Sequence, residues 1–320
     1  MNDQRQVVVI ARVLLPAGRD RLSERFELRE GGLDATRAAV LRLAPGAGAL
    51  VADPSVPVEA ELLDACGPEL RVVANFAVGY DNVDLEACRE RGVAVTNTPD
   101  VLTEATAELA LALTLAAARR MSDAERDLRA GRWRGWDPAD YRGIEIRGAT
   151  VGVVGMGRIG YRYAGLARGL GAEIVYAGPS AKPQAEGDLG ARRLEFEQLL
   201  EAADVVSLHA PATPETRGLI SVRELELIGP KGVLVNTSRG PLVDSEAVAA
   251  ALESGALGAA GLDVYENEPE VSPALLAAPR CVLLPHIGSA TVRSRDGMAN
   301  AVADNVIAVL EGREPPGRVA

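Results

Sequence analysis

The chain has 320 residues, of which 48% are hydrophobic, and a formal net charge of −11 at pH 7. Single hydrophobic cores stop growing at roughly 250–300 residues, and the apolar fraction is too high for a disordered chain, so we expect two folded domains. The acidic balance argues against a basic face, and therefore against nucleic acid or an anionic membrane as a partner.

Three widely spaced cysteines show no metal-ligand spacing, which indicates a reducing compartment and no metal site. Cys281 lies in an apolar run and is expected in a core rather than as a nucleophile. The first apolar run, Val7–Ala11, is too short for a signal-peptide core, and Leu109–Ala118 is too short to span a bilayer. The sequence therefore predicts a soluble, cytoplasmic protein.

Short β-branched runs alternate with longer helical patterns along the whole chain. A helix from about Leu102 to Arg120 separates two series of strands, and a last helix, about Thr291–Glu311, has no strand left to serve in the second series. Near-continuous apolar strands between helices are typical of parallel sheets covered on both faces, so we predict an α/β fold. The predicted strands are Val7–Ala11, Ala49–Ala52, Val72–Asn75, Val93–Thr96, Thr150–Val154, Glu173–Ala177, Asp204–Leu208, Val233–Asn236, Ala259–Asp263 and Val282–Leu284.

A glycine-rich segment follows the strand at Thr150–Val154 and reads G-x-G-x-x-G before a helix that runs to about Leu170. Strand and helix on either side are the context that this dinucleotide-binding pattern requires. The first glycine permits a tight turn, the second a close approach to a pyrophosphate, and the third close packing of helix on strand. The residues expected at the phosphates are Gly155, Gly157, Arg158, Ile159 and Gly160.

The next strand, Glu173–Ala177, ends without the Asp or Glu that usually binds the ribose hydroxyls of NAD. A 2′-phosphate would meet no repulsion there, and Ser180 and Lys182 are suited to contact it. The sequence therefore favours NADPH over NADH, and a neutral loop that accepts either cofactor is the alternative. The loop residues assigned to the cofactor are Gly178, Pro179, Ser180 and Lys182.

Candidate catalytic side chains follow the last strands of the second series. Hydride transfer to a ketone needs a proton donor, for which histidine is suited, and a cation for the substrate carboxylate, for which the arginine fork is suited. Of the two histidines, His286 follows a strand end, and we expect His209 to pack in a cofactor loop. Arg239 and Glu268 also follow strand ends, where ligands bind in open α/β sheets.

These segments resemble the D-isomer-specific 2-hydroxyacid dehydrogenase family over nearly the whole chain. Residues 75–84 and 96–103 are similar to its glyoxylate/hydroxypyruvate reductase branch in particular. The resemblance implies a flavodoxin-like substrate-binding domain at 1–98 plus 288–320, and a dinucleotide-binding Rossmann domain at 99–287, with a cleft between them. It also implies a homodimer through the Leu102–Arg120 helix.

The resemblance assigns roles to individual residues. His286 is the expected acid/base, Glu268 its carboxylate partner, with Glu266 as a rival, and Arg239 the anchor for the substrate. Trp136 either reaches the neighbouring subunit's active site or fills an apolar gap. The backbone of Val78 and Gly79 is expected to hold the substrate carboxylate. Further residues expected at the cofactor are Thr103, His209, Ala210, Pro211, Thr216, Thr237, Ser238, Arg239, Asp263, His286 and Gly288.

The sequence thus predicts reduction of glyoxylate or hydroxypyruvate by a nicotinamide cofactor. Another member of the family, acting on a larger 2-keto acid, phosphite or formate, is the first alternative. A nicotinamide-sensing protein like the family's corepressors is an alternative of a different class, because fold alone does not settle function.

Overall fold

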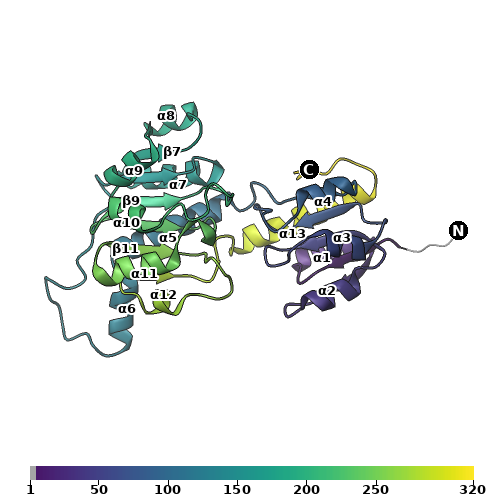
Figure 1. Cartoon of the computed structure of the whole chain (residues 1–320), viewed down its shortest axis with the longest axis horizontal. Helices are drawn as coiled ribbons and strands as arrows, with labels where there is room; N and C mark the ends of the chain where they lie inside the picture. Colours follow the sequence, from purple (N-terminus) through teal and green to yellow (C-terminus); the bar gives the residue numbers. More distant parts are fainter. Residues whose placement is uncertain (1–4) are drawn as a thin grey trace. The chain divides into compact units, whose positions relative to one another are not determined.

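The computed structural model describes residues 5–320, which divide into two compact units. The terminal unit contains the chain as far as Leu102 together with Ser289–Ala320, and the central unit contains Thr103–Gly288 (Figure 1). Each unit is built on one sheet in which all the strand pairs are parallel, which confirms the predicted α/β class. Assignment of the two units to substrate and cofactor stays a prediction.

The terminal unit has a five-stranded sheet in the order β2-β1-β3-β4-β5. Every residue of β3 and β4 is buried, and α2, α3 and α4 cover one face of the sheet with a core that includes Cys66 and Cys88. On the rest of the sheet the long C-terminal helix α13 packs against α1 and the central strands, so segments from the two ends of the sequence form one unit (Figure 1). Its elements are β1 (Val7–Ile10), α1 (Pro16–Ser23), β2 (Glu27–Glu30), α2 (Arg37–Leu43), β3 (Ala47–Ala52), α3 (Ala60–Cys66), β4 (Val72–Asn75), α4 (Leu85–Glu90), β5 (Ala94–Thr96) and α13 (Val292–Leu310).

The central unit has a seven-stranded sheet in the order β12-β11-β10-β9-β6-β7-β8. Helices α5 and α7 bury one face, and α9, α10 and α11 bury the other. Its elements are α5 (Thr103–Ala118), α6 (Met121–Arg129), β6 (Thr150–Val154), α7 (Arg158–Gly169), β7 (Glu173–Ala177), α8 (Pro183–Leu189), β8 (Arg192–Arg193), α9 (Phe196–Ala202), β9 (Val205–Leu208), α10 (Val222–Ile228), β10 (Val233–Asn236), the 3₁₀ turn η1 (Gly240–Leu242), α11 (Ser245–Ser254), β11 (Ala259–Leu262), α12 (Pro273–Ala277) and β12 (Cys281–Leu283).

The ten predicted strands are confirmed, with ends that differ by a residue or two, and so are the three predicted helices. Two edge strands, β2 and β8, were not predicted, because neither has an apolar face to bury. Cys281 is buried in the apolar core under α11, as expected, where burial raises its pKa to about 12 and keeps it a thiol. Among residues 5–320, no helix is long and apolar enough to cross a membrane.

Candidate active site

The carboxyl ends of five parallel strands, β6 and β9 to β12, define one edge of the central sheet. Since the strands run in the same direction, the segments that follow them meet at this edge. The glycine loop follows β6, His209 follows β9, Arg239 follows β10, Asp263 follows β11 and His286 follows β12. The sheet therefore gathers side chains that are far apart in the sequence.

The glycine loop has the geometry that a dinucleotide needs. Gly155 has φ +94°, and a Cβ at this position would lie 2.7 Å from the backbone after β9. A Cβ at Gly160 would lie 2.2 Å from the Gly155 carbonyl oxygen, so only glycine lets α7 pack this close to β6. Nothing lies within 4 Å of a Cβ built at Gly157, at the N-cap of α7. The loop is therefore closed toward the sheet and open at the helix N-terminus, where phosphates bind.

His286 and Glu268 form a close pair. The distance from His286 Nδ1 to Glu268 Oε2 is 2.6 Å, and the other carboxylate oxygen accepts a hydrogen bond from the Tyr265 amide at 2.9 Å. Both side chains are only partly exposed, at 38% and 32%. The carboxylate therefore fixes one ring nitrogen of the histidine and leaves the other to a reacting group.

The environment of Glu268 keeps this side chain ionised. Burial raises its pKa, but the hydrogen bonds from His286 and the Tyr265 amide and the nearby charges of His286 and Arg239 outweigh that effect, so its pKa lies below the ordinary value. The ionised Glu268 is therefore a charged hydrogen-bond partner of the His286 ring. The rival carboxylate, Glu266, instead contacts Arg217 at 3.4 Å.

Gly240, which follows Arg239, allows this arginine to lie next to the turn that carries Glu268. A Cβ at Gly240 would lie 1.9 Å from the Tyr265 carbonyl, so glycine alone permits the η1 turn to touch the segment that carries Glu268. The Arg239 carbonyl accepts a hydrogen bond from the buried Asn236 side chain at 2.9 Å. The guanidinium of Arg239 donates through Nη1 to the Ser238 carbonyl at 2.8 Å. These contacts fix the backbone from which the Arg239 side chain extends.

Asp263 holds the loop that carries His286. Its carboxylate is fully buried and accepts hydrogen bonds from the amides of Ile287 and Gly288, both at 2.8 Å. Burial raises its pKa, and these two bonds oppose the shift. Between these contacts His286 adopts φ +54°, a left-handed conformation that is uncommon outside glycine and clusters at functional sites. The predicted contact of Asp263 with the nicotinamide stays a prediction.

The loops beside this pair contain the other predicted cofactor residues. His209 is enclosed, with its Nε2 2.9 Å from Ser207 Oγ and its ring 5.0 Å from that of Tyr163, and burial lowers its pKa to about 3. Thr216 Oγ1 donates to the Pro211 carbonyl at 2.7 Å, and Ser238 Oγ donates to the carbonyl that ends β9 at 2.9 Å. The lowered pKa keeps His209 neutral near pH 7, and the role of these residues at the cofactor stays a prediction.

The loop after β7 is held from two sides. The Lys182 amide donates to the Tyr176 hydroxyl at 2.7 Å, and Arg193 Nη2 donates to the Gly178 carbonyl at 2.9 Å. Pro179 and Ser180 are exposed between these contacts. Arg193 was missed by the sequence analysis, because it lies on the two-residue edge strand β8, which no periodicity marks.

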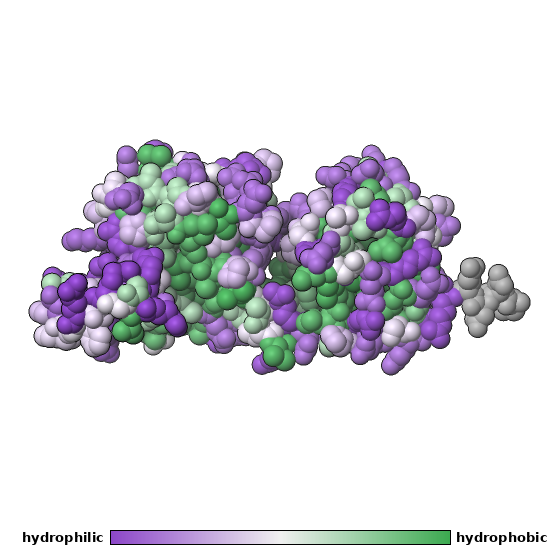
Figure 2. Space-filling model, turned by 90° about the horizontal axis from the view of Figure 1, so that it is seen from below, coloured by the Kyte–Doolittle hydropathy of each residue, from purple (hydrophilic) through white to green (hydrophobic). Residues whose placement is uncertain are grey.

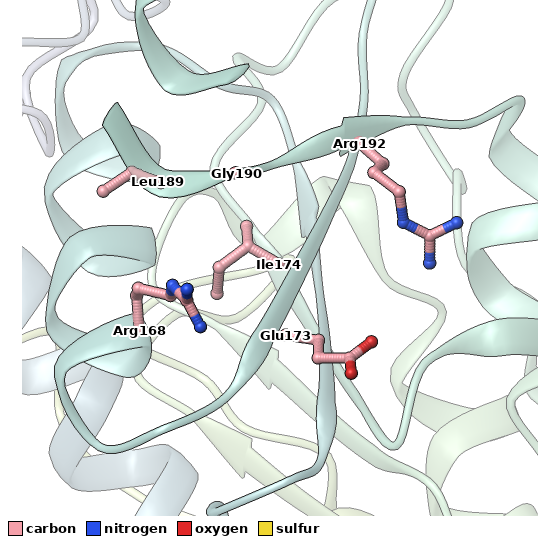
Figure 3. Close-up of a pocket in the computed structure, with 6 residues that line it drawn as sticks. All are labelled: Arg168, Glu173, Ile174, Leu189, Gly190 and Arg192. Atoms are coloured by element: carbon pink, nitrogen blue, oxygen red, sulfur yellow. The ribbon is translucent and has the colours of Figure 1, made fainter. Parts of the chain in front are cut away.

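A hollow on the surface of the central unit lies away from this edge. It has a volume of about 230 Å³ and begins at the amino end of β7, where Glu173 and Ile174 stand (Figure 3). Because ligands of open α/β sheets bind beyond the carboxyl ends of strands, this hollow is not the expected cofactor site. Its other lining residues are Arg168, Leu189, Gly190 and Arg192.

Five further residues named in the sequence analysis lie at other places in the two units. Val78 and Gly79 belong to the terminal unit, in the turn after β4. Trp136 is 85% exposed in the long segment after α6, together with Trp133, so it fills no apolar gap within the described residues. Thr103 is the first residue of α5, and Gly288 ends the central unit with its carbonyl bound by Thr106.

Residues 111–288, more than half of the chain, match the model of the family described as "D-isomer specific 2-hydroxyacid dehydrogenase, NAD binding domain". A protein named glyoxylate reductase from Thermococcus kodakarensis is 44% identical over 318 residues, which cover 98% of this chain and 95% of that one. The chain belongs to the D-isomer-specific 2-hydroxyacid dehydrogenase family. It is an NAD(P)-dependent enzyme that acts on a CH–OH group.

Two solved structures are similar to this chain over nearly its whole length. A protein of Thermus thermophilus superposes with a TM-score of 0.92 at 44% identity, over 98% of this chain and 100% of that one. An NADPH-dependent glyoxylate/hydroxypyruvate reductase from Sinorhizobium meliloti, solved with NADP and malonate, superposes with a TM-score of 0.88 at 36% identity, over 99% and 97% of the two chains. The dehydrogenase therefore uses a nicotinamide cofactor.

Proposed function

We propose that this dehydrogenase reduces glyoxylate and hydroxypyruvate to their 2-hydroxy acids, with His286 as the proton donor. The observation that carries the proposal is the 2.6 Å contact between His286 Nδ1 and an ionised Glu268, with Arg239 beside the same turn. A donor, its charge partner and a cation are the groups that reduction of a keto acid requires.

The glycine loop fits a dinucleotide, since its glycines close the loop toward the sheet and leave room at the N-terminus of α7. Gly155, Gly157 and Gly160 with the first amides of α7 would hold the pyrophosphate, and the segments after β9, β10 and β11 would line the rest of the cofactor. When bound, the reduced nicotinamide supplies a hydride to the substrate carbon. The residues of the chain supply everything else: position, charge and the proton.

Each catalytic residue has one task in this proposal. The second nitrogen of His286, Nε2, gives its proton to the carbonyl oxygen, and Glu268 stabilises the protonated ring through Nδ1 beforehand. Arg239 binds the substrate carboxylate and balances the charge that develops on the carbonyl oxygen. The amides of Val78 and Gly79 bind the same carboxylate from the terminal unit, which makes that unit the substrate-binding domain and the central unit the dinucleotide-binding domain.

We propose NADPH as the preferred cofactor. The loop after β7 presents no carboxylate to a 2′-phosphate, and the guanidinium of Arg193 lies at the Gly178 carbonyl, where an NAD-type site has its acid. Lys182 and Ser180 of the same loop add a second cation and a hydroxyl. The NADPH-dependent relative from Sinorhizobium meliloti supports the same preference.

The enzyme is proposed to act as a cytoplasmic homodimer. After Glu108, helix α5 is apolar at every position except the buried Thr114, and Leu109, Leu111 and Leu115 remain partly exposed. Met121, Leu128 and the two tryptophans add exposed apolar side chains on α6 and the segment after it. The face of this unit shown in Figure 2 carries a broad apolar area among hydrophilic residues. A second copy of the chain would bury such a surface.

The test is the initial rate of loss of reduced-cofactor absorbance with glyoxylate and with hydroxypyruvate, run with NADPH and NADH in parallel. We expect turnover of both keto acids and a higher kcat/KM with NADPH. Turnover only with a larger keto acid, formate or phosphite would replace the proposed substrate and keep the chemistry. Tight cofactor binding without any turnover would favour a sensing role.

A further inference from the structure

In the terminal unit, the first three backbone carbonyls of the turn Ala77–Tyr80 each accept a hydrogen bond. The Ala77 carbonyl accepts from the Thr98 amide at 2.9 Å. Those of Val78 and Gly79 accept from side-chain amides, Asn97 Nδ2 and Asn75 Nδ2, both at 2.8 Å. Each of these three consecutive peptide units is thereby held in place.

In a trans peptide unit, the N–H points away from the preceding carbonyl. The bonds of this turn are trans, since the only cis peptide bond among residues 5–320 is Glu268–Pro269. The amides of Val78, Gly79 and Tyr80 therefore point away from the three donors. Over the described part of the chain none of these amides donates to a protein acceptor, so they are available to an external one.

The two asparagines are themselves anchored. Asn75 ends β4, is fully buried and also contacts Asn82, which bonds to the backbone after β3. The backbone amide of Asn97 donates to the Gly317 carbonyl at 2.9 Å. The backbone carbonyl of Asn97 accepts a hydrogen bond from the Asn305 side chain of α13 at 3.0 Å. These contacts fix the asparagines before a ligand arrives.

We infer that Asn97 and Asn75 are positioning residues that aim the amides of Gly79 and Tyr80 at the substrate carboxylate, with Tyr80 as a third donor beside the Val78 amide, whose peptide unit the Thr98 backbone holds. This rests on the proposed function. Neither asparagine touches the substrate. They act by preventing the peptide units from turning their carbonyls, which repel an anion, toward it.

The decisive variant is Asn97→Ala, because Asn97 is only half-buried and makes a single side-chain bond to the turn. We expect the KM for glyoxylate to rise about 10- to 100-fold, the range for a lost hydrogen bond to a charged group. Because the carboxylate is bound in both ground and transition state, kcat changes less than KM. The KM for NADPH stays within about twofold, and Asn97→Gln, which keeps the amide, recovers part of the loss.

Two controls separate positioning from a loss of structure. Asn300→Ala removes another half-buried amide of the terminal unit, one that bonds to Asp296 and Arg21, and should leave both KM values unchanged. Methyl glyoxylate has no carboxylate charge, so its kcat/KM should be alike in wild type and Asn97→Ala. Equal losses for the acid and the ester would overturn the inference.

A second measurement needs no variant. In the wild-type enzyme saturated with NADPH, the backbone amide signals of Val78, Gly79 and Tyr80 should move on addition of oxalate, a mimic of the substrate's carboxylate. If they do not move, the inference is wrong whether or not Asn97→Ala folds. Absence of wild-type turnover with any keto acid would instead contradict the proposed function.

Discussion

Glu268→Gln removes the negative charge of this side chain and keeps its size and shape. Glutamine can keep the bond that Oε1 accepts from the Tyr265 amide, but it then turns an NH₂ group toward His286 Nδ1, now 2.6 Å from a carboxylate oxygen. A protonated ring would place N–H against N–H. The variant therefore disfavours the form of His286 that gives up a proton, while the loop and the cofactor site keep their structure.

The magnitude follows from the type of bond that is lost. A hydrogen bond between charged partners contributes about 1.5–3 kcal/mol. Since about 1.4 kcal/mol changes a rate tenfold, kcat/KM for glyoxylate should fall about 10- to 150-fold at pH 7. The KM for NADPH should change by less than about twofold.

The assay is steady-state NADPH oxidation with glyoxylate from pH 5 to 9. Glu266→Gln is the matched control, because it removes the same charge two residues away from a side chain that contacts Arg217 instead of His286. The reasoning is refuted if Glu268→Gln retains wild-type kcat/KM over this range, or if Glu266→Gln gives the same profile.

Three further perturbations test other parts of the account. Burial lowers the His209 pKa to about 3, so the unfolded state takes up a proton below pH about 6.5 and the folded state does not. The free energy of unfolding should therefore fall by up to about 1.4 kcal/mol per pH unit on acidification. In urea unfolding at pH 7 and pH 4.5, His209→Gln should remove this dependence on pH. Equal slopes would contradict it. Gly160→Ala, which places a Cβ 2.2 Å from a carbonyl oxygen, should weaken NADPH binding at least about tenfold in a fluorescence titration, whereas Gly165→Ala on the same helix, with its nearest atom 3.9 Å away, should not. Arg193→Ala should lower the NADPH/NADH ratio of kcat/KM about tenfold, and Arg192→Ala should leave it unchanged; an unaltered ratio in Arg193→Ala would remove the residue from the 2′-phosphate site.

Much of the fold was predictable because buried parallel strands consist of nearly continuous runs of apolar residues. Val205 and Val235 pack in the core on one face of the central sheet, and their neighbours Val206 and Leu234 pack in the core on the other, so these strands are apolar on both sides and stand out from the helices between them. The edge strand Glu27–Glu30 has no such run and was missed. Exposure at an edge removes the pattern that prediction depends on.

The candidate site was predictable to the extent that chemistry and strand ends coincide. His286 and Arg239 each follow a strand, and so their meeting at one edge follows from parallel topology. The contacts that orient them were not predictable. The bonds from Ile287 and Gly288 to Asp263 and the hold of Asn97 on Val78 depend on loop conformations that no periodicity encodes.

The central claim is that His286 supplies the proton to a 2-keto acid, and a single comparison tests it most directly. Wild type and His286→Ala are assayed for NADPH oxidation with glyoxylate, with NADPH affinity measured by fluorescence on the same samples. The account predicts rapid wild-type turnover and a loss of about 10²- to 10⁴-fold in the variant, the usual range for a general acid, with cofactor affinity nearly intact. Turnover by His286→Ala within about threefold of wild type would contradict it.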